Sequence, residues 1–234
     1  MNFRYLIIVL FLLLSNFNTS FSQKIANKQF SLISYDISIS NEITDELSDL
    51  ESYIKAIKVY NTPESDKIKA IFIHNTFYTI TDELKKDLKI DILPINAFLT
   101  KVKYDNYGYP QTNIQNAIRK GNSPFYFKVQ VTIESYTKKY SELNPDQFTD
   151  LNYKAIVPKI IIDITVYNKD GVIPVDRWFG EATSIKPLEI NEYLLTGFDN
   201  KDIELLDDQE NPLDNFFFLL HKAIDNVIQD YYTK

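Results

Sequence analysis

The histidines are the first residues to examine for chemistry, because histidine titrates close to neutral pH and is a common metal ligand. The chain has two, His74 and His221, and neither has a second histidine at an HxH or HxxxH spacing. The sequence has no cysteine, which excludes disulfides, thiolate metal sites and a cysteine nucleophile. It also lacks the GxSxG elbow of serine hydrolases and the glycine-rich loops that hold phosphates. We therefore predict no catalytic residue, no metal ligand and no cofactor.

Carboxylates are the second source of chemistry. One acidic run suggests calcium, but its spacing does not match an EF-hand loop and the central glycine is missing. We interpret this run as a solvated loop; it consists of Asp202, Glu204, Asp207, Asp208 and Glu210. A carboxylate pair for glycoside hydrolysis stays open, because the chain has 32 acidic residues and the sequence does not show which of them meet.

Aromatic side chains form the candidate binding site. Tyr104, Tyr107 and Tyr109 crowd one Gly-Pro loop, and Trp178 is the only tryptophan of the chain. Exposed aromatic side chains on a loop stack on sugars or anchor a protein partner. The alternative is that the tyrosines pin the loop by packing and that Trp178 lies in the core. These four residues are the predicted binding residues, with a protein or a glycan as the ligand.

A hairpin over residues 158–184 is the clearest structural element. Its first strand alternates, so that one face is buried and most of the other is wet, and Asn168–Gly171 forms the turn. The return strand is expected at 172–183, where Gly180 predicts a bulge or a close backbone approach. In this register Asp163 and Arg177 form a cross-strand pair. The apolar face of the first strand consists of Ile160, Ile162, Ile164 and Val166.

The remaining elements follow from hydrophobic periodicity. Strands are predicted at 28–40, 68–75, 89–93 and 124–136, and helices at 41–57, 79–88, 111–120 and from Asn211 onward. The first strand should bury Ile33, Tyr35, Ile37 and Ile39. Asn41 or Thr44 should cap the first helix, and Thr79 should open the second with a capping box. The main apolar face of the last helix is Leu213, Phe217, Leu220, Ile224, Val227 and Tyr231.

These elements predict an α/β fold of the α+β type. Its sheet should be mixed and largely antiparallel, with about five strands, helices packed on it and a long C-terminal helix. We expect one globular domain over residues 23–234, in which 23–65 form a strand–helix extension to a core at 66–234.

Residues 1–22 have the pattern of a signal peptide. Arg4 provides the positive charge, Tyr5–Leu14 form an apolar run, and Ser20 and Ser22 provide the small residues before the expected cleavage site. This run is too short for a transmembrane helix, which needs about 20 apolar residues. We therefore expect an exported protein, periplasmic or extracellular, without a transmembrane segment in the mature chain and without a lipid anchor on cysteine.

The net charge of −7 disfavours two classes of partner. The acidic residues are spread along the chain and no basic stripe balances them, so nucleic acid and anionic membrane surfaces are not expected partners.

From Ile68 onward, the predicted order is strand, helix, short strand, helix, strand, hairpin and long terminal helix. Together with the segments VYNKDGVIPVDRWFGEA and FFFLLHKAIDNVI, this order resembles a class of bacterial envelope domains. The class includes the amino-terminal domain of the Tol-system periplasmic protein and the curli-secretion type of lipoprotein. The chain departs from the lipoprotein members by lacking their anchoring cysteine. The resemblance carries no catalytic motif and implies a non-enzymatic role in envelope assembly or transport.

We therefore predict a non-catalytic interaction module of the cell envelope, with an envelope protein as its partner. The alternative is a secreted carboxylate-based hydrolase or a glycan-binding protein that uses the Tyr104–Tyr109 loop. A hydrolase needs two acids about 5–10 Å apart in a cleft. An interaction module needs an exposed apolar patch or an unpaired sheet edge. A small-ligand carrier needs a pocket of a few hundred cubic ångströms lined by aromatic side chains.

Overall fold

A computed structural model describes residues 25–48, 67–139, 154–185, 187–188 and 214–234. These residues build one five-stranded sheet in the order β2-β1-β3-β4-β5. β1 runs parallel to β2 and β3, whereas β3, β4 and β5 are antiparallel. The predicted fold class is confirmed. The strands are β1 Gln29–Ile39, β2 Asp91–Ile92, β3 Phe125–Lys139, β4 Lys154–Asn168 and β5 Asp176–Thr183.

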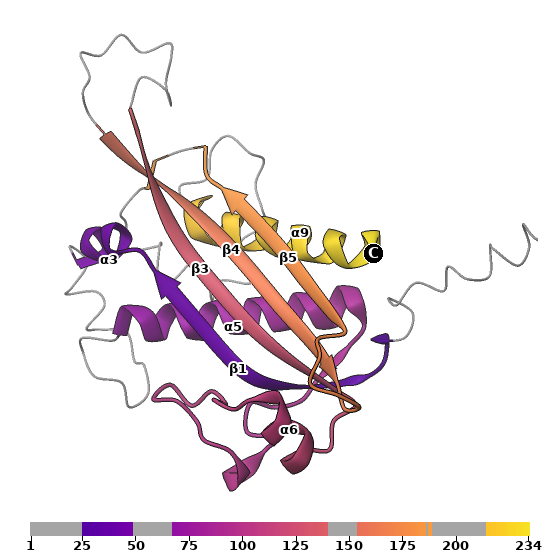
Figure 1. Cartoon of the computed structure of the whole chain (residues 1–234). Coiled ribbons are helices and arrows are strands. Elements are labelled where there is room, and N and C mark those ends of the chain that lie inside the picture. The colour runs from indigo at the N-terminus through magenta and orange to yellow at the C-terminus, as the bar shows by residue number, and fades with distance from the viewer. Residues whose placement is uncertain (1–24, 49–66, 140–153, 186, 189–213) are drawn as a thin grey trace, which may run out of the picture.

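Helices cover both faces of the sheet unequally. The two long helices α5 and α9 lie behind one face in Figure 1, and α9 runs along β5. The short helix α6 packs on the opposite face, where Phe98, Ala117 and Tyr126 form a second, smaller core with Ile33. The helices are α3 Asn41–Ser48, α5 Lys67–Leu88, a 3₁₀ turn Leu99–Lys101, α6 Ile114–Lys120, a π-helical turn Asp214–Phe218 and α9 Leu219–Thr233.

The main core lies between the sheet and the two long helices. In β3 the residues predicted to share one face do so, since Phe127, Val129 and Val131 are buried in this core. In β4 the alternation from Ile160 to Val166 is also confirmed, and these side chains are fully buried. The hairpin strands differ slightly from the prediction, because β4 begins at Lys154 and β5 only at Asp176.

In β1, one residue lies on the face opposite to the predicted one. Its register against β3 shifts between Leu32 and Ser34, which is a β-bulge at Ile33. Leu32 and Tyr35 therefore both face the main core, and Ile33 faces the small core on the opposite side. The prediction that Ile33 shares a face with Tyr35 was wrong, because one inserted residue reverses the alternation.

The largest difference from the prediction is at α5. Residues 68–75 were predicted as a strand and Thr79 as a helix cap, but one continuous helix spans Lys67–Leu88. The hydroxyl of Thr79 donates to the carbonyl of Asn75, one turn earlier in this helix. The first turns are buried on several sides at once, so the sequence shows neither helical nor strand periodicity there. The buried residues of these turns are Ala70, Ile71, Phe72 and Ile73.

Gly180 is confirmed as a close backbone approach rather than a bulge, because the register of β5 is continuous. A Cβ atom at Gly180 would lie 2.1 Å from the carbonyl oxygen of Ala223 and 2.6 Å from the nitrogen of Val227. The α9 backbone therefore lies directly on β5. The π-helical turn before α9 also shifts its buried face, so that Phe216 is buried and Phe217 is half-buried.

Other predictions hold in a modified form or fall outside the description. α6 ends before Gly121 as predicted. Ser40, rather than Asn41 or Thr44, caps α3, since its Oγ accepts the N–H of Ile43 at 3.5 Å. The signal peptide at 1–22, the end of the helix predicted at 41–57, the start of the last helix at Asn211 and the acidic run at 202–210 lie outside the described residues.

Candidate functional site

The loop that carries the predicted tyrosines is shaped by one carboxylate. Asp105 Oδ1 accepts the backbone N–H groups of Tyr107 at 2.9 Å and Tyr109 at 2.8 Å. The N–H of Asp105 donates to the carbonyl of Tyr109 at 2.8 Å, which closes the loop. Gly108 has a φ of 87°, a left-handed conformation that favours glycine. The loop is therefore a compact turn with a defined backbone.

The three tyrosines of this loop are largely engaged in packing. Tyr109 is buried, with ring centroids 5.3 Å from Tyr35 and 5.0 Å from Phe77, and this burial raises the pKa of its hydroxyl. Tyr107 is half-buried, and the Lys69 ammonium lies 5.8 Å from its ring centroid.

The Tyr104 hydroxyl is also buried, and this burial raises its pKa. It lies near the backbone of Phe98 but has no hydrogen bond of ordinary geometry within the described part of the chain. The packing alternative therefore accounts for most of this loop.

Trp178 does not join the tyrosine loop. Its side chain is 1% exposed and its Nε1–H donates to Asp176 Oδ2 at 2.8 Å. Its ring centroid lies 5.4 Å from that of Tyr231 on α9 and 6.3 Å from that of Phe30 on β1. Trp178 is thus part of the core, and the four predicted binding residues do not share one surface.

A hollow of about 510 Å³ lies beside the loop, between α5 and residues 92–96, with Gly108 at its margin. Its exposed aromatic side chain is Tyr78, which is 47% exposed. Asp82 is the one carboxylate among its described lining residues, so the pair of acids that a hydrolase needs is not found there. Tyr78 was not among the predicted binding residues. Its spacing to Asp82 and Lys85 places all three on one helix face, but that signal requires recognising α5 as a helix.

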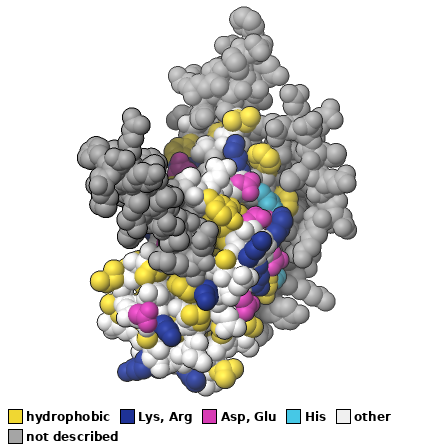
Figure 2. All heavy atoms as spheres, turned by 90° about the vertical axis from the view of Figure 1, so that its right-hand side faces the viewer, with side chains coloured by type: hydrophobic (Ala, Val, Ile, Leu, Met, Phe, Trp, Pro, Cys, Tyr) yellow, Lys and Arg dark blue, Asp and Glu magenta, His cyan; other side chains and the backbone are white. Residues whose placement is uncertain are grey.

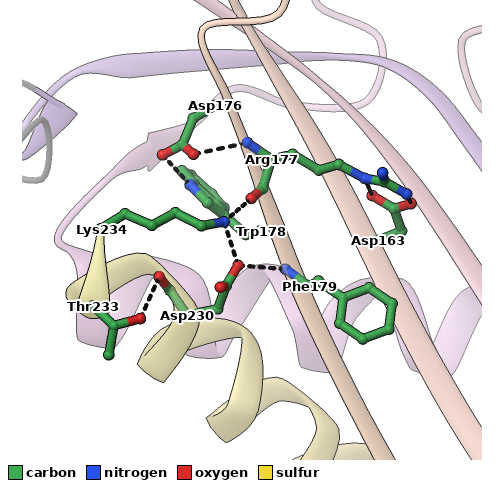
Figure 3. Close-up of polar contacts among 8 residues, drawn as sticks. All are labelled: Asp163, Asp176, Arg177, Trp178, Phe179, Asp230, Thr233 and Lys234. Atoms are coloured by element: carbon green, nitrogen blue, oxygen red, sulfur yellow. Dashed lines mark hydrogen bonds and ion pairs between the residues drawn. The ribbon is translucent and has the colours of Figure 1, made fainter.

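The edge of the sheet at β5 is closed by polar side chains of α9 (Figure 3). Asp230 Oδ2 accepts the backbone N–H of Phe179 at 2.9 Å. The Lys234 ammonium donates to the carbonyl of Arg177 and pairs with Asp230 at 2.6 Å. Further along the edge, the Asn226 amide donates to the carbonyl of Glu181 at 2.7 Å. One backbone group of each of three successive outward residues of β5, Arg177, Phe179 and Glu181, is therefore occupied.

The opposite edge is closed only along the first part of β1. β2 pairs with Gln29 and Phe30, and the N–H of Thr112 donates to the carbonyl of Ile33 at 3.0 Å. The N–H of Ser40 donates to Ile133 of β3 at 2.9 Å. Because backbone groups alternate in direction along a strand, Ile37 and Ile39 point theirs away from β3. Within the described residues nothing pairs with them, and this Ile37–Ile39 segment is called the open edge below.

The face of the sheet opposite α5 and α9 carries paired charges. Arg177 Nε donates to Asp163 Oδ1 at 2.8 Å, which confirms the predicted cross-strand pair (Figure 3). Lys159 and Glu181 pair at 2.7 Å on the same face. Among the coloured residues in Figure 2, basic side chains lie beside acidic and hydrophobic ones.

Within the described residues, neither histidine belongs to a cluster that could hold a metal ion. His221 lies with its ring 4.4 Å from that of Phe217, and burial lowers its pKa. His74 stacks edge-on against Tyr78 at 4.6 Å. No three His, Asp or Glu side chains of the described ranges are placed to hold a metal ion. None of the helices described here has the length and apolar character to cross a membrane.

Comparison with known proteins gives no family assignment. No family model and no curated protein matches the chain. Among solved structures, a hypothetical protein, CT253, from Chlamydia trachomatis is similar at 11% identity with a TM-score of 0.42, covering 89% of this chain and 100% of that one. A putative neuraminyllactose-binding hemagglutinin homolog from Helicobacter pylori is similar at 10% identity with a TM-score of 0.33, covering 88% of each chain. Similarities at this level carry no argument about function, and the resemblance to Tol-system and curli-secretion domains stays a prediction.

Proposed function

We propose that this protein is a non-catalytic binding module of the bacterial cell envelope, and that an extended segment of a protein partner pairs with the open edge of β1. The observation that carries the proposal is the difference between the two edges of the sheet. An unpaired edge presents N–H and C=O groups to which a further strand can add. At the β5 edge, side chains of α9 already bond to outward backbone groups. Within the described residues, the outward backbone groups of the Ile37–Ile39 segment have no such partner.

The side chains of β1 suit this mode of binding. Tyr35 and Ile37 are buried in the main core and hold the strand in place, whereas Asp36 and Ser38 are exposed. The hydroxyl of Tyr35 is hydrogen-bonded to Thr76 of α5 at 2.6 Å. The edge is therefore rigid before a partner arrives, which lowers the entropic cost of binding.

The charges around the open edge indicate a basic partner segment. α3 follows directly after β1, contains Glu42, Asp45 and Glu46 and has no basic residue. On β1 itself, Asp36 carries a further negative charge. Its Oδ2 lies 3.9 Å from Lys128 Nζ, and both side chains are about half exposed. Complementary charge steers a partner and fixes its register. A strand with Lys or Arg side chains beside Asp36 and α3 therefore fits best.

The envelope location rests on the predicted signal peptide. Export with cleavage after Ser22 places Gln23 at the start of the mature chain, a few residues before β1. Sequencing the amino terminus of the protein isolated from its own cells tests this part. A terminus at Gln23 is the expected result, and retention of Met1 in the isolated protein contradicts export.

Site-specific photo-crosslinking tests the binding edge. A photoreactive amino acid replaces Ser38 on β1 in one variant and Thr183 on β5 in a matched control, since both side chains are exposed. Crosslinking in intact cells should attach one defined peptide of an envelope protein at position 38 and none at position 183. An additional Asp36→Lys change should reduce the yield severalfold. Equal products at both positions, or a yield insensitive to Asp36→Lys, contradict the proposal.

A further inference from the structure

The hollow beside α5 supports a second, separate binding site that does not depend on the open edge. Its volume of about 510 Å³ lies within the range of roughly 300–1,000 Å³ typical of small-molecule sites. Its walls come from one face of α5 and from residues 92–96, and Gly108 of the tyrosine loop completes its margin. The site therefore has a helix on one side and two anchored loops on the others.

One stripe of α5 provides the recognising side chains. Tyr78, Asp82 and Lys85 are separated by four and three residues, so they lie on the same helix face and all line the hollow. Asn96 lines the hollow from the loop after β2. A half-exposed tyrosine ring stands here beside a carboxylate, an ammonium group and an amide.

The base of the site is held rigidly. Phe77 and Ile92 are buried in the main core while also lining the hollow. The ring of Tyr78 packs edge-on against His74 at 4.6 Å and against Phe77 at 5.5 Å. The hydroxyl of Thr81 donates to the carbonyl of Tyr78 at 3.1 Å within the helix. Tyr78 is therefore fixed in orientation although 47% of its surface is exposed.

The chemistry of the lining selects the class of ligand. Asp82 and Lys85 contribute one negative and one positive charge, so neither a strongly anionic nor a strongly cationic ligand is favoured. A wholly apolar ligand would cover the polar groups of Asp82 and Asn96 without giving them partners. A neutral ligand with an apolar face and several hydroxyls satisfies both, since hydroxyls donate and accept hydrogen bonds.

We infer that the hollow binds a neutral saccharide of one or two rings. The C–H face of one ring would lie on Tyr78, and its hydroxyls would reach Asp82, Lys85 and Asn96 at the rim. Aromatic side chains are suited to this role because they offer a large apolar surface with few rotatable bonds.

Amide shifts in NMR spectra of the isotope-labelled protein test the inference, with maltose and N,N′-diacetylchitobiose as the two probes. At least one sugar should shift the amides of residues 77–85 and those of Leu93, Ile95 and Asn96 in a saturable manner. Tyr78→Ala should weaken binding about tenfold or more, and Asp82→Asn should weaken it severalfold while retaining the fold. Tyr136→Ala is the matched control, because Tyr136 is also exposed, at 42%, but lies on β3 away from the hollow.

Two outcomes overturn the site. One is the absence of saturable shifts in the hollow with both sugars. The other is binding that Tyr78→Ala leaves unchanged while Tyr136→Ala weakens it. The variant Asp36→Lys should leave sugar binding unchanged, so failure at the open edge and failure at the hollow are distinguished.

Discussion

The two edges of this sheet, at β5 and at the later part of β1, have different neighbours although both consist of ordinary strand residues. At β5, the helix α9 lies against the strand. Asp230 and the C-cap residue Lys234 bond to outward backbone groups of the strand (Figure 3), and Asn226 bonds to a third group further along it. At β1, the two-residue strand β2 and the loop at Thr112 pair with the first half of the strand. Within the described residues, Ile37–Ile39 are left unpaired.

The difference shows that an edge is closed by tertiary neighbours rather than by its own sequence. Asn226 and Asp230 of α9 and Lys234 at its C-cap are ordinary polar residues spaced four apart in the sequence. They close the β5 edge only because Gly180 allows the α9 backbone to lie against the strand. Among the residues that the structure describes, no helix lies in that position at the β1 edge, and the acidic helix α3 follows the end of the strand instead. The first edge is thus closed within the fold, and the second is the edge to which we propose that a partner strand binds.

The largest effect is expected at the contact that holds the closed edge. Gly180→Ala adds a Cβ 2.1 Å from a backbone oxygen of α9, which cannot move without undocking the helix. We expect a loss of about 3 kcal/mol or more in the free energy of unfolding by urea, or no folded protein. Gly171→Ala is the matched control, because nothing lies within 4 Å of its added Cβ, and it should change stability by less than about 0.5 kcal/mol. Similar stability of both variants would contradict the close docking of α9.

A smaller effect is expected when the closing side chains are removed and α9 is kept. Asn226→Ala with Asp230→Ala leaves the Phe179 N–H and the Glu181 carbonyl without their partners. We expect a loss of about 1–3 kcal/mol and concentration-dependent association through the freed β5 edge, measured by urea unfolding and sedimentation. Asp225→Ala, at an exposed position of the same helix, is the control. A double variant that stays monomeric and fully stable would show that these bonds do not close the edge.

The pH dependence of α9 docking gives a third effect. Burial lowers the pKa of His221 below its ordinary value of 6.5, against the smaller opposing influence of Glu83 and Asp225; Lys86 lowers it further. The unfolded chain therefore binds a proton more readily than the folded protein. The contribution of neutral His221 to the free energy of unfolding is thus complete above pH 6.5 and declines as the pH falls below it. His221→Gln should flatten the fall in unfolding free energy between neutral pH and about pH 5. An unchanged slope in this variant would contradict the assignment.

The smallest effect is expected on the face of the sheet opposite α5 and α9. Asp163 and Arg177 form an ion pair there, and Arg177 is exposed to solvent. Asp163→Asn should change the unfolding free energy by less than about 1 kcal/mol, and high salt should reduce the difference further. A loss of more than about 2 kcal/mol would mean that this pair holds the sheet together as strongly as α9 does.

Local sequence patterns predicted the fold correctly where a segment buries one face and exposes the other. The strict alternation of Phe127, Val129 and Val131 predicted the core face of β3. Gly180 predicted either a bulge or a close approach, and the structure shows the close approach. Patterns failed where a segment has several environments at once. The start of α5 is buried on more than one side, and the bulge at Ile33 places one apolar side chain in a second core.

The candidate site was less accessible from the sequence than the fold. Tyr109 and Trp178 were predicted as binding residues, with packing as the alternative. Both are buried, and their burial depends on Phe77 and Tyr231, which are distant in the chain. Tyr78 was overlooked because its helix was divided between a strand and a capping box. The open edge could not be predicted, since it is defined by where α9 and β2 come to lie.

Hydrogen exchange of backbone amides, resolved residue by residue in the free protein, tests the central claim most directly. The amide of Phe179 is bonded to Asp230 and that of Ser40 to Ile133, so both should be strongly protected. The amides of Ile37 and Ile39 should exchange at least about a hundredfold faster, although they lie in the same rigid strand. Comparable protection of all four amides would contradict the claim that β1 offers an open edge to a partner.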